Sequence, residues 1–443
     1  MVEPTTIFAL SSAPGRAGVA VVRISGPEAG AVIDAMAAPR PKDRFAALRR
    51  IADPATGQTL DEALVLWLVA PRTETGEDVA ELHLHGGPAI VKAVLRALSE
   101  IPGLRLAEPG EFARRAFHNG KLDLAQVEGL ADLIDAETEA QRQHALAQMR
   151  GALSDLYEGW RRDLLEACAL MEAAIDFSDE SDVAGDAVEH AAGIVRELQA
   201  SVAAHLADGH RGEILRDGFR VVLAGPPNAG KSSLLNALAR RDAAIVSEEA
   251  GTTRDVLEVR LDLAGVPVII ADTAGIRDTE GAIEREGVRR ALAHAREADL
   301  VLWLNDSTTE PLAPPSDVSD RGDKLFLAVA SKIDIPGAAP SPRMLGISAH
   351  TRAGLDHLVE QIGRMAHERV GDPASPAITR ERYRANLMQC MHALQTFMNS
   401  PLHEHELRAE DLRTAIQALG RITGRVDVEH VLGEIFGRFC IGK

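Results

Sequence analysis

The alternation of apolar and polar residues divides the chain into four successive patterns. Residues 1–118 contain short runs of β-forming residues separated by turns, namely TTIFAL, GVAVVRISG, EALVLWLVA and DVAELHLHGG. The run IVKAVLRALSEI that follows them has helical periodicity. We therefore predict an N-terminal α/β domain over residues 1–118.

Longer helices are predicted in residues 119–215. Leu153, Trp160, Leu164 and Met171 belong to one apolar stripe at helical spacing, and Leu198 belongs to a second. Between the two stripes lies the acidic stretch DFSDESDVAGDAVE, which has the composition of a loop. This region is predicted to be the first part of a helical domain.

The period changes again in residues 216–375, where apolar strands alternate with helices. FRVVLAG, VPVIIAD, DLVLWL and KLFLAVA are apolar, as the strands of a parallel sheet are, whereas VLEVRLDL alternates. Ala264 and Gly265 can form the turn of one antiparallel hairpin. Helical spacing returns in residues 376–443, so the simplest interpretation is an α/β domain inserted into a helical domain. The predicted fold class is multidomain, with α/β and α domains.

Composition narrows the class of protein. The chain has 443 residues, 46% of them hydrophobic, and a formal net charge of -18 without a basic stripe. RNA binding would therefore need a partner that supplies positive charge. Cys168, Cys390 and Cys440 are too far apart in sequence for a disulfide framework or a paired metal site. Without a leader peptide or a long apolar run, we expect a cytoplasmic, soluble protein with no membrane partner.

A phosphate-binding motif is present at residues 225–233. GPPNAGKSS fits the pattern G-x-x-x-x-G-K-[ST] and lies between an apolar strand and a helical segment. Its glycines let backbone N–H groups converge on phosphates. Lys231 adds a point charge, and Ser232 offers a hydroxyl to Mg²⁺. A chance glycine-rich turn would not need the strand and the helix on either side.

Two further elements fit the same chemistry. DTAG begins with Asp272 at the end of an apolar strand, where a carboxylate can hold Mg²⁺ through water. Gly275 lets a backbone N–H approach the γ-phosphate. In GTTRD, residues 251–255, Thr253 is expected to complete the Mg²⁺ shell. A segment of this kind is typically ordered by the γ-phosphate and released after hydrolysis.

Ser331, Lys332 and Asp334 occupy the position where GTPases commonly carry Asn-Lys-x-Asp. Asp334 can accept from the N1 and N2 groups of guanine, which adenine does not offer, so GTP is predicted rather than ATP. Lys332 can pack over the base. Ser331 is shorter than Asn, so one contact is lost or passes through water. Ser348 and Ala349 resemble the last guanine-binding loop.

The hydrolytic residue is less evident. Ile276 stands where many small GTPases carry the Gln that orients the attacking water, and isoleucine cannot do this. Either hydrolysis is intrinsically slow or another residue acts. The acidic residues nearby can equally belong to a solvated helix start. They are Asp278, Glu280, Glu284 and Glu286.

Several long motifs together resemble the MnmE (TrmE) family of tRNA modification GTPases. They are GPPNAGKSSLLNAL, AGTTRD, DTAGIRDTEGAIEREG, PGRAGVAVVRISG, TGEDVAELHLHGG, PGEFARRAFHNGKLDLAQVEGLADLID and the terminal CIGK. The resemblance covers nearly the whole chain. It implies a folate-binding and dimerisation domain (1–118), a helical domain in two parts (119–215 and 376–443) and an inserted Ras-like P-loop G domain (216–375).

In that family a K⁺ ion takes the place of an arginine finger. The resemblance implies Asn228, Ser247, Glu249 and Thr252 as K⁺ ligands here, and Glu284 as the acid that positions water. Enclosure of K⁺ is completed when two G domains meet, so a homodimer is expected. The residues expected to contact GTP are Asn228, Ala229, Gly230, Lys231, Ser232, Ser233, Ser247, Glu248, Glu249, Ala250, Gly251, Thr252, Thr253, Asp272, Thr273, Ala274, Gly275, Ser331, Lys332, Asp334, Ser348 and Ala349.

The resemblance also implies a tetrahydrofolate one-carbon donor, 5,10-methylene- or 5-formyl-, contacted by Arg23, Glu81, Lys121 and Lys443. Cys440 becomes a candidate catalytic residue, although the residues alone favour a tail thiol without a role. The implied reaction couples GTP hydrolysis to addition of an aminomethyl or carboxymethylaminomethyl group at carbon 5 of the wobble uridine of tRNA. The implied partner is the FAD-dependent protein MnmG (GidA), in a heterotetramer or larger complex.

Two other functions are open at this stage. The chain could be a ribosome-assembly or switch GTPase without one-carbon chemistry, but it lacks an appended basic module and carries the CIGK terminus. It could be a folate enzyme regulated by nucleotide, but Lys231, Ser232 and Asp272 are intact. His83 and His85 alternate on a predicted strand without a third ligand nearby in sequence, so packing or substrate contact is favoured over a metal site.

Overall fold

The computed structural model describes the chain except for residues 1–4, 177–180, 242, 246–257, 273–297, 316–324, 339–340, 342, 402, 427–428, 438, 440 and 443. The chain divides into two compact units. One unit combines Met1–Ala131 with Gly420–Lys443, and the other is Asp132–Leu419. The last residues of the chain therefore fold with the first.

The first unit is built on a sheet with the strand order β3-β4-β5-β2-β1-β6. Neighbouring strands are antiparallel, except that β1 and β6 are parallel. The strands are β1 (Thr6–Leu10), β2 (Ala17–Ser25), β3 (Ala47–Ala52), β4 (Thr59–Leu68), β5 (Val79–Gly86) and β6 (Leu104–Leu106). Sequence reasoning predicted β1, β2, β4 and β5, and it missed the two edge strands β3 and β6.

Two helices cover one face of this sheet. Alternate strand residues such as Val65 and Leu82 point to that face and pack with Ile33 of α1 (Ala29–Met36) and Val94 of α2 (Pro88–Ser99). On the opposite face, among the described residues, Phe112 of α3 (Glu111–His118) packs on Ile7 and Ala9 of β1. Much of the second face is therefore left to polar side chains.

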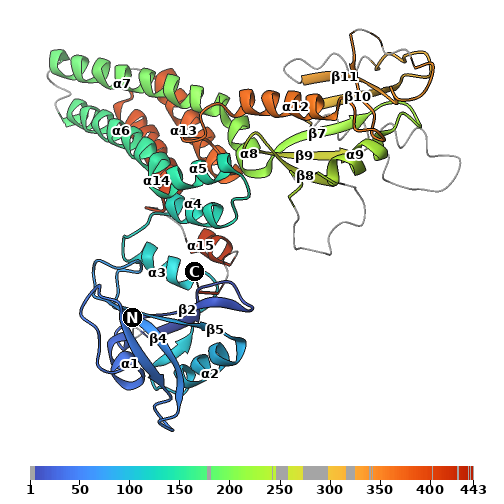
Figure 1. Ribbon diagram of the computed structural model, residues 1–443. Coiled ribbons are helices and arrows are strands. Elements are labelled where there is room, and N and C mark those ends of the chain that lie inside the picture. Colours follow the sequence, from blue (N-terminus) through green and yellow to red (C-terminus); the bar gives the residue numbers. More distant parts are fainter. Residues whose placement is uncertain are drawn as a thin grey trace, which may run out of the picture. The chain divides into compact units, whose positions relative to one another are not determined.

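The chain's C-terminal segment closes the first unit. α15 (Glu429–Phe436) packs beside α3 and near the start of α4 (Leu124–Ile134), with Phe436 and Phe439 buried against Ala113 and Val127 (Figure 1). These contacts join segments more than 300 residues apart in sequence. A short bridge between Pro109 and Ile441 extends the attachment.

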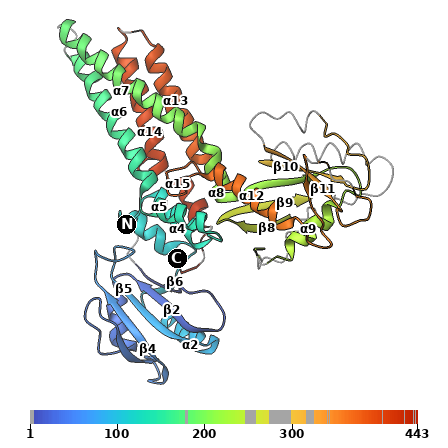
Figure 2. The same ribbon diagram turned by 45° about the horizontal axis from the view of Figure 1, so that its top comes forward.

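The second unit contains a helical bundle. α6 (Ala152–Asp176) and α7 (Ser181–Ala207) form a long antiparallel hairpin, and α13 (Glu381–Asn399) packs along α7 (Figure 2). α5 (Glu139–Met149) and most of α14 (His405–Thr423) complete it. Helices from both sides of the inserted domain thus build one bundle, which confirms the predicted insertion.

One sequence prediction is wrong. The acidic stretch interpreted as a loop is helical from Ser181 onward, as the first turns of α7. Val188 and Ala191 are buried and continue the apolar spacing of Val195, whereas Asp186 and Glu189 are exposed. The apolar residues are widely spaced small side chains, so packing against the bundle, rather than local composition, determines this helix.

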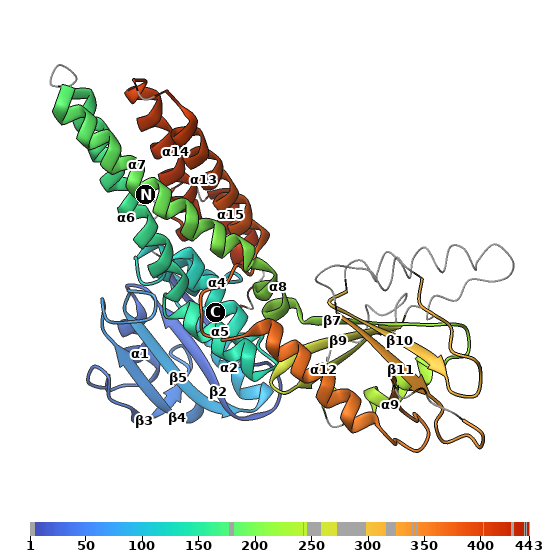
Figure 3. The ribbon, with the colours of Figure 1, turned by 90° about the horizontal axis from the view of Figure 1, so that it is seen from above.

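The inserted domain follows α8 (Gly209–Asp217) and has the strand order β12-β11-β10-β7-β9-β8. Its strands are β7 (Phe219–Ala224), β8 (Glu258–Leu263), β9 (Val266–Asp272), β10 (Leu300–Asp306), β11 (Leu325–Ser331) and β12 (Leu345–Gly346). All pairs are parallel except the hairpin of β8 and β9, as predicted. α9 (Lys231–Ala239) and α12 (Leu355–Val370) share one core with the sheet (Figure 3).

The two chain segments that connect this domain to the bundle are tied to each other. Arg211 of α8 donates to the carbonyls of Ser375 and Pro376, and Arg216 donates to the carbonyl of Thr379. The bundle also touches the β8–β9 turn directly, because the backbone N–H of Ala140 donates to the Gly265 carbonyl at 2.9 Å. The insertion is therefore hydrogen-bonded at its junction.

Candidate functional site

The phosphate-binding motif lies where the parallel strand β7 ends and α9 begins. Gly230 is the residue before α9 and has φ +90°, and Asn228 has φ +63°. These left-handed conformations turn the chain sharply so that backbone N–H groups point toward the start of the helix. The partial positive charge of the helix N-terminus adds to them, so the loop is suited to bind phosphate. The Asn228 side chain is exposed beside it.

Lys231 is folded over this loop. Its Nζ donates to the carbonyls of Gly225 and Pro226, both at 2.9 Å, and the residue is buried. Burial lowers the pKa of Lys231, and the nearby Asp272 carboxylate acts in the opposite direction. The ammonium group thus lies at the centre of the loop, close to where a bound phosphate would need positive charge.

Ser232 and Asp272 meet although they are 40 residues apart. The register of β7 on β9 places Leu223 opposite Asp272, so the carboxyl ends of both strands reach the same edge. The Ser232 hydroxyl donates to Asp272 Oδ2 at 2.6 Å, and Asp272 is buried. A hydroxyl and a carboxylate are oxygen ligands of the kind that Mg²⁺ takes together with water and phosphate. The residues present fit that ion.

The predicted base-reading residues lie at the same edge, after β11. The Asp334 carboxylate has its pKa lowered by the Ser348 hydroxyl, so it is ionised and able to accept from a base. Lys332, with φ +58°, donates from Nζ to Asp306 Oδ2 at 2.6 Å. Burial would raise the pKa of Asp306, but the hydrogen bond and charge of Lys332 and the hydrogen bonds from Thr308 together outweigh it and lower the pKa to about 2.

Asp306 was not singled out from the sequence. The available signal was its position at the end of β10, because polar residues at the carboxyl ends of parallel strands commonly line a ligand crevice. The structure brings together Lys231, Ser232, Asp272, Ser331 and Asp334. Glu284, Ser247 to Thr253, Thr273, Ala274 and Gly275 lie outside the described residues.

A second group of predicted residues lies on the uncovered face of the first sheet. Arg23 of β2 is the cross-strand partner of Glu81 of β5, and Arg23 Nε donates to Glu81 Oε1 at 3.0 Å. Glu74 adds an ion pair to Arg23 at 2.6 Å. Burial would raise the pKa of Glu81, but hydrogen bonds from His83 and Arg23 outweigh it and lower that pKa. Glu74 and His83 were not predicted as members of this group.

Lys121 comes close to this face through the loop before β5. The side-chain amide of Asn119 donates to the Thr75 carbonyl at 2.7 Å. A Cβ built on Gly76 would lie 2.9 Å from the Asn119 side chain and 3.2 Å from Lys121 Cε. Lys121 thus lies against the loop that carries Glu74, the partner of Arg23.

The end of the chain reaches the same region. A Cβ on Gly442, whose φ is +101°, would lie 2.1 Å from the Leu10 carbonyl oxygen, so glycine is needed for this close approach. Leu10 follows Ala9, the cross-strand partner of Arg23. Cys440 and Lys443 themselves lie outside the described residues.

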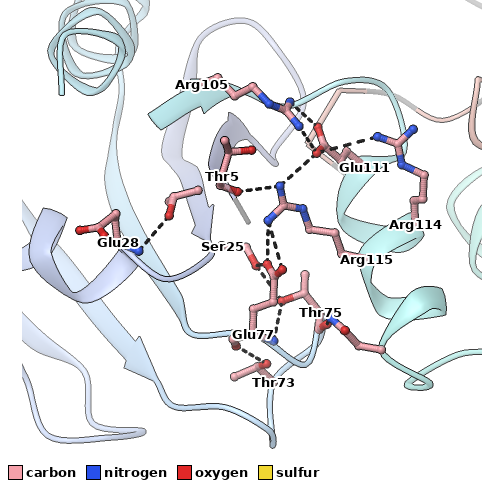
Figure 4. A network of polar contacts seen from close by, with 12 residues as sticks. Thr5, Ser25, Glu28, Thr73, Thr75, Glu77, Arg105, Glu111, Arg114 and Arg115 are labelled. Carbon is pink, nitrogen blue, oxygen red and sulfur yellow. Dashed lines mark hydrogen bonds and ion pairs between the residues drawn. The ribbon is translucent and has the colours of Figure 1, made fainter. Parts of the chain in front are cut away.

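A network of ion pairs holds α3 to this sheet (Figure 4). The buried Glu111 carboxylate accepts from Arg105 at 2.8 and 2.5 Å and from Arg115 at 3.1 Å. Arg115 also donates to Glu77, which in turn accepts from Ser25 of β2. The network connects the helix before Lys121 to the strand that carries Arg23, so it supports the geometry of the open face.

The cysteines and histidines that the structure describes do not form a metal site. In the part of the chain that the structure describes, no cluster of three or more His, Cys, Asp or Glu side chains could hold a metal ion. Cys168 and Cys390 are buried in the bundle, and burial raises the pKa of the Cys390 thiol to about 12. His85 Nδ1 is paired with Asp61 at 2.8 Å instead.

The arrangement of side chains at the edge of the inserted sheet defines the class of protein. A P-loop beside the hydrogen-bonded Ser232 and the buried Asp272, with Asp334 and Ser348 at the neighbouring strand ends, is the architecture of a guanine-nucleotide-binding domain. A family model described as "MnmE helical domain" matches residues 124–440, and one described as "GTP-binding protein TrmE N-terminus" matches residues 6–121.

Relatives match over the whole chain. The tRNA modification GTPase MnmE of Parvibaculum lavamentivorans is 54% identical over 99% of this chain and 100% of its own length. That of Methylorubrum populi is 52% identical over 100% of this chain and 99% of its own length. The chain therefore belongs to the MnmE family and is a GTPase.

A solved structure also matches in part. The G domain of the T. maritima FeoB iron transporter is 25% identical, with 33% of this chain and 98% of that chain covered and a TM-score of 0.25. Within the described residues, no helix has the length and apolar character that a membrane span requires.

Proposed function

We propose that this protein hydrolyses GTP to drive modification of carbon 5 of the wobble uridine in tRNA, with a tetrahydrofolate derivative as one-carbon donor. The observation that carries the proposal is the presence, in one chain, of two charged sites of different chemistry. One is the nucleotide edge around Lys231 and Asp334, and the other is the open sheet face around Arg23 and Glu81. The names of the MnmE relatives supply the substrate class.

In the nucleotide site, each described group has a separate task. Lys231 would leave the two P-loop carbonyls for the β- and γ-phosphates, which offer it a full charge. Ser232 and Asp272 would face Mg²⁺, Ser232 directly and Asp272 through water. Mg²⁺ supplies charge neutralisation between the phosphates. Asp334 would accept from the N1 and N2 groups of guanine.

The hydrolytic step needs positive charge and an oriented water. We propose that K⁺ provides the charge, held by Asn228, whose exposed side chain lies beside the phosphate loop, with Ser247, Glu249 and Thr252. Glu284 would orient the water, since Ile276 cannot. Meeting of two G domains in a homodimer would exclude bulk water from this site, which strengthens electrostatic stabilisation.

On the open face, Arg23 and Glu81 offer a cation and an acceptor next to each other, as recognition of a pterin ring with a glutamate tail requires. Lys121 lies at the adjoining loop, and Gly442, the residue before Lys443, lies beside Leu10 of the same sheet. The folate derivative supplies the one-carbon unit when bound. Cys440 belongs to the same C-terminal segment and is a candidate catalytic residue. Its substitution would test whether it takes part in the reaction.

The partner is expected to bind much of the tRNA. A formal net charge of -18 disfavours a phosphate backbone unless positive charge is supplied by another protein. We propose that the FAD-dependent protein MnmG fills this role in a joint complex.

The test is GTP turnover by the full chain in K⁺ and in Na⁺ at matched ionic strength. We expect K⁺ to stimulate turnover by about tenfold or more, on the order of one well-placed charge in the transition state. Glu284→Ala should abolish this stimulation, while the matched control Glu286→Ala should keep it. Equal rates in both salts would refute the K⁺ mechanism.

The folate site is tested separately by equilibrium dialysis with 5-formyltetrahydrofolate. Loss of the Arg23 guanidinium in Arg23→Ala should weaken binding by about tenfold or more, because a charge-assisted contact to the ligand is removed. Arg50→Ala, an exposed arginine on the edge strand β3, serves as control. No saturable binding to the wild-type chain would favour a switch GTPase without one-carbon chemistry.

A further inference from the structure

Ser331 lies beneath the phosphate loop rather than at the surface of the base pocket. Its hydroxyl donates to the Ala229 carbonyl at 2.6 Å and lies 3.1 Å from the Asn305 carbonyl, and the residue is 5% exposed. Its own carbonyl accepts from the backbone N–H and hydroxyl of Ser307. Ser331 is therefore held on both sides, between the P-loop and the end of β10.

The number of protons on the Ser331 side chain limits how many hydrogen bonds it can donate to a bound base. A serine hydroxyl has one proton, and at Ser331 the short contact to Ala229 takes it. Breaking that contact would leave a buried backbone carbonyl without its donor. An asparagine at this position would carry two N–H donors, so it could keep the P-loop carbonyl and still reach a second acceptor.

Guanine presents donors on one edge and acceptors on another. Asp334 is suited to the N1–H and N2–H₂ donors, whereas N7 is an acceptor and needs a donor from the protein. The nearest other side-chain donor among the described base-reading residues, Lys332 Nζ, is paired with Asp306 at 2.6 Å. The two candidate side chains for N7 therefore already have partners.

We propose that Ser331 is a positioning residue that ties the P-loop to the base-reading loop, and that this protein recognises guanine through Asp334 without reading N7. The inference rests on GTP binding at this site. It predicts a nucleotide specificity that differs from that of a protein with asparagine at the same position.

The experiment compares GTP with 7-deaza-GTP, in which N7 is replaced by a carbon that accepts no hydrogen bond. Both nucleotides are titrated calorimetrically into the full wild-type chain with Mg²⁺. The two dissociation constants should agree within about twofold, less than the change that one net hydrogen bond brings. A wild-type preference for GTP of about fivefold or more would overturn the proposal, and this result needs no variant to fold.

Variants separate positioning from base contact. Ser331→Asn should bind GTP about three- to tenfold more tightly, the range of one added hydrogen bond, with 7-deaza-GTP unchanged. Ser331→Ala should weaken the binding of GTP and of 7-deaza-GTP equally. Ser331→Thr, which restores a hydroxyl, should recover the binding of both nucleotides. If Ser331→Ala weakens GTP alone, the hydroxyl contacts the base and the proposal is wrong. Absence of saturable GTP binding to the wild-type chain would overturn the nucleotide function itself.

Discussion

Glu111 is a buried carboxylate that ties α3 to Arg105 of the first sheet, and Glu111→Gln tests how much its charge stabilises the first unit. The side chain is 2% exposed and accepts from Arg105, Arg115 and the backbone N–H of Glu108. Burial alone would raise its pKa, but the hydrogen bonds from Arg105 and the others outweigh it, and the pKa falls from 4.5 to about 2. The folded state therefore strongly favours the charged carboxylate.

The magnitude follows from that shift. At about 1.4 kcal/mol per pKa unit, the drop corresponds to roughly 3 kcal/mol of stability. The Arg105 side chain is 42% exposed, so water screens its contribution, and we expect a loss of about 2 kcal/mol for Glu111→Gln at pH 7. Because the folded pKa is depressed, this stability is present above pH 4.5 and is lost as the pH falls toward 2.

The assay must report on the first unit alone. Of the three tryptophans in the chain, Trp67 lies in the first unit, so Trp160→Phe and Trp303→Phe leave a single reporter there. With a urea dependence of about 2 kcal/mol per molar, the loss of about 2 kcal/mol moves the unfolding midpoint down by about 1 M. When the pH falls from 6 to 3.5, the difference in unfolding free energy between Glu111→Gln and the parent should shrink by roughly 40%.

A matched control isolates burial from charge. Glu108→Gln breaks the pair with Arg114, whose side chains are 62% and 37% exposed, so it should cost well under about 1 kcal/mol. Equal lowering of the midpoint by both variants at pH 7 would show that burial of Glu111 adds nothing. A Glu111→Gln loss of stability that stays constant down to pH 3.5 would show that the carboxylate charge does not stabilise the fold.

Two further outcomes follow from the nucleotide site. Lys231→Ala should reduce GTP affinity by about 100-fold, because a buried cation that can pair with phosphate is removed, whereas the exposed Lys92→Ala should have no effect in the same titration. Asp334→Asn should lose about 100-fold in GTP affinity and bind xanthosine triphosphate instead, since the amide can donate to the carbonyl at carbon 2 of xanthine. A variant that still prefers GTP would show that Asp334 does not read the base.

Local sequence was enough to predict much of this architecture. The apolar runs ending at Ala224, Asp272 and Ser331 are strands, and the hairpin turn lies at Ala264 and Gly265. These predictions succeed because strand alternation and turn chemistry depend on residues close together in the chain. The P-loop pattern likewise specifies a local conformation, with its glycine at the residue before α9.

The helical regions were harder to assign. The acidic start of α7 has loop-like composition, and its helix depends on Val188 and Ala191 finding a partner surface in the bundle. Which helix packs on which is equally non-local, as with α7 and α13, because equivalent apolar stripes are compatible with many pairings.

The functional sites show the same difference between local and non-local information. Residue types such as Lys231 and Asp334 are evident from spacing, but the contact of Ser331 with the Ala229 carbonyl joins residues 102 positions apart. The attachment of Gly442 to Leu10 spans nearly the whole chain. The sequence by itself determined most of the strands, the P-loop and which residues carry charge. Only tertiary structure decided which donors already have partners, because a hydrogen bond depends on distances between segments that no local pattern encodes.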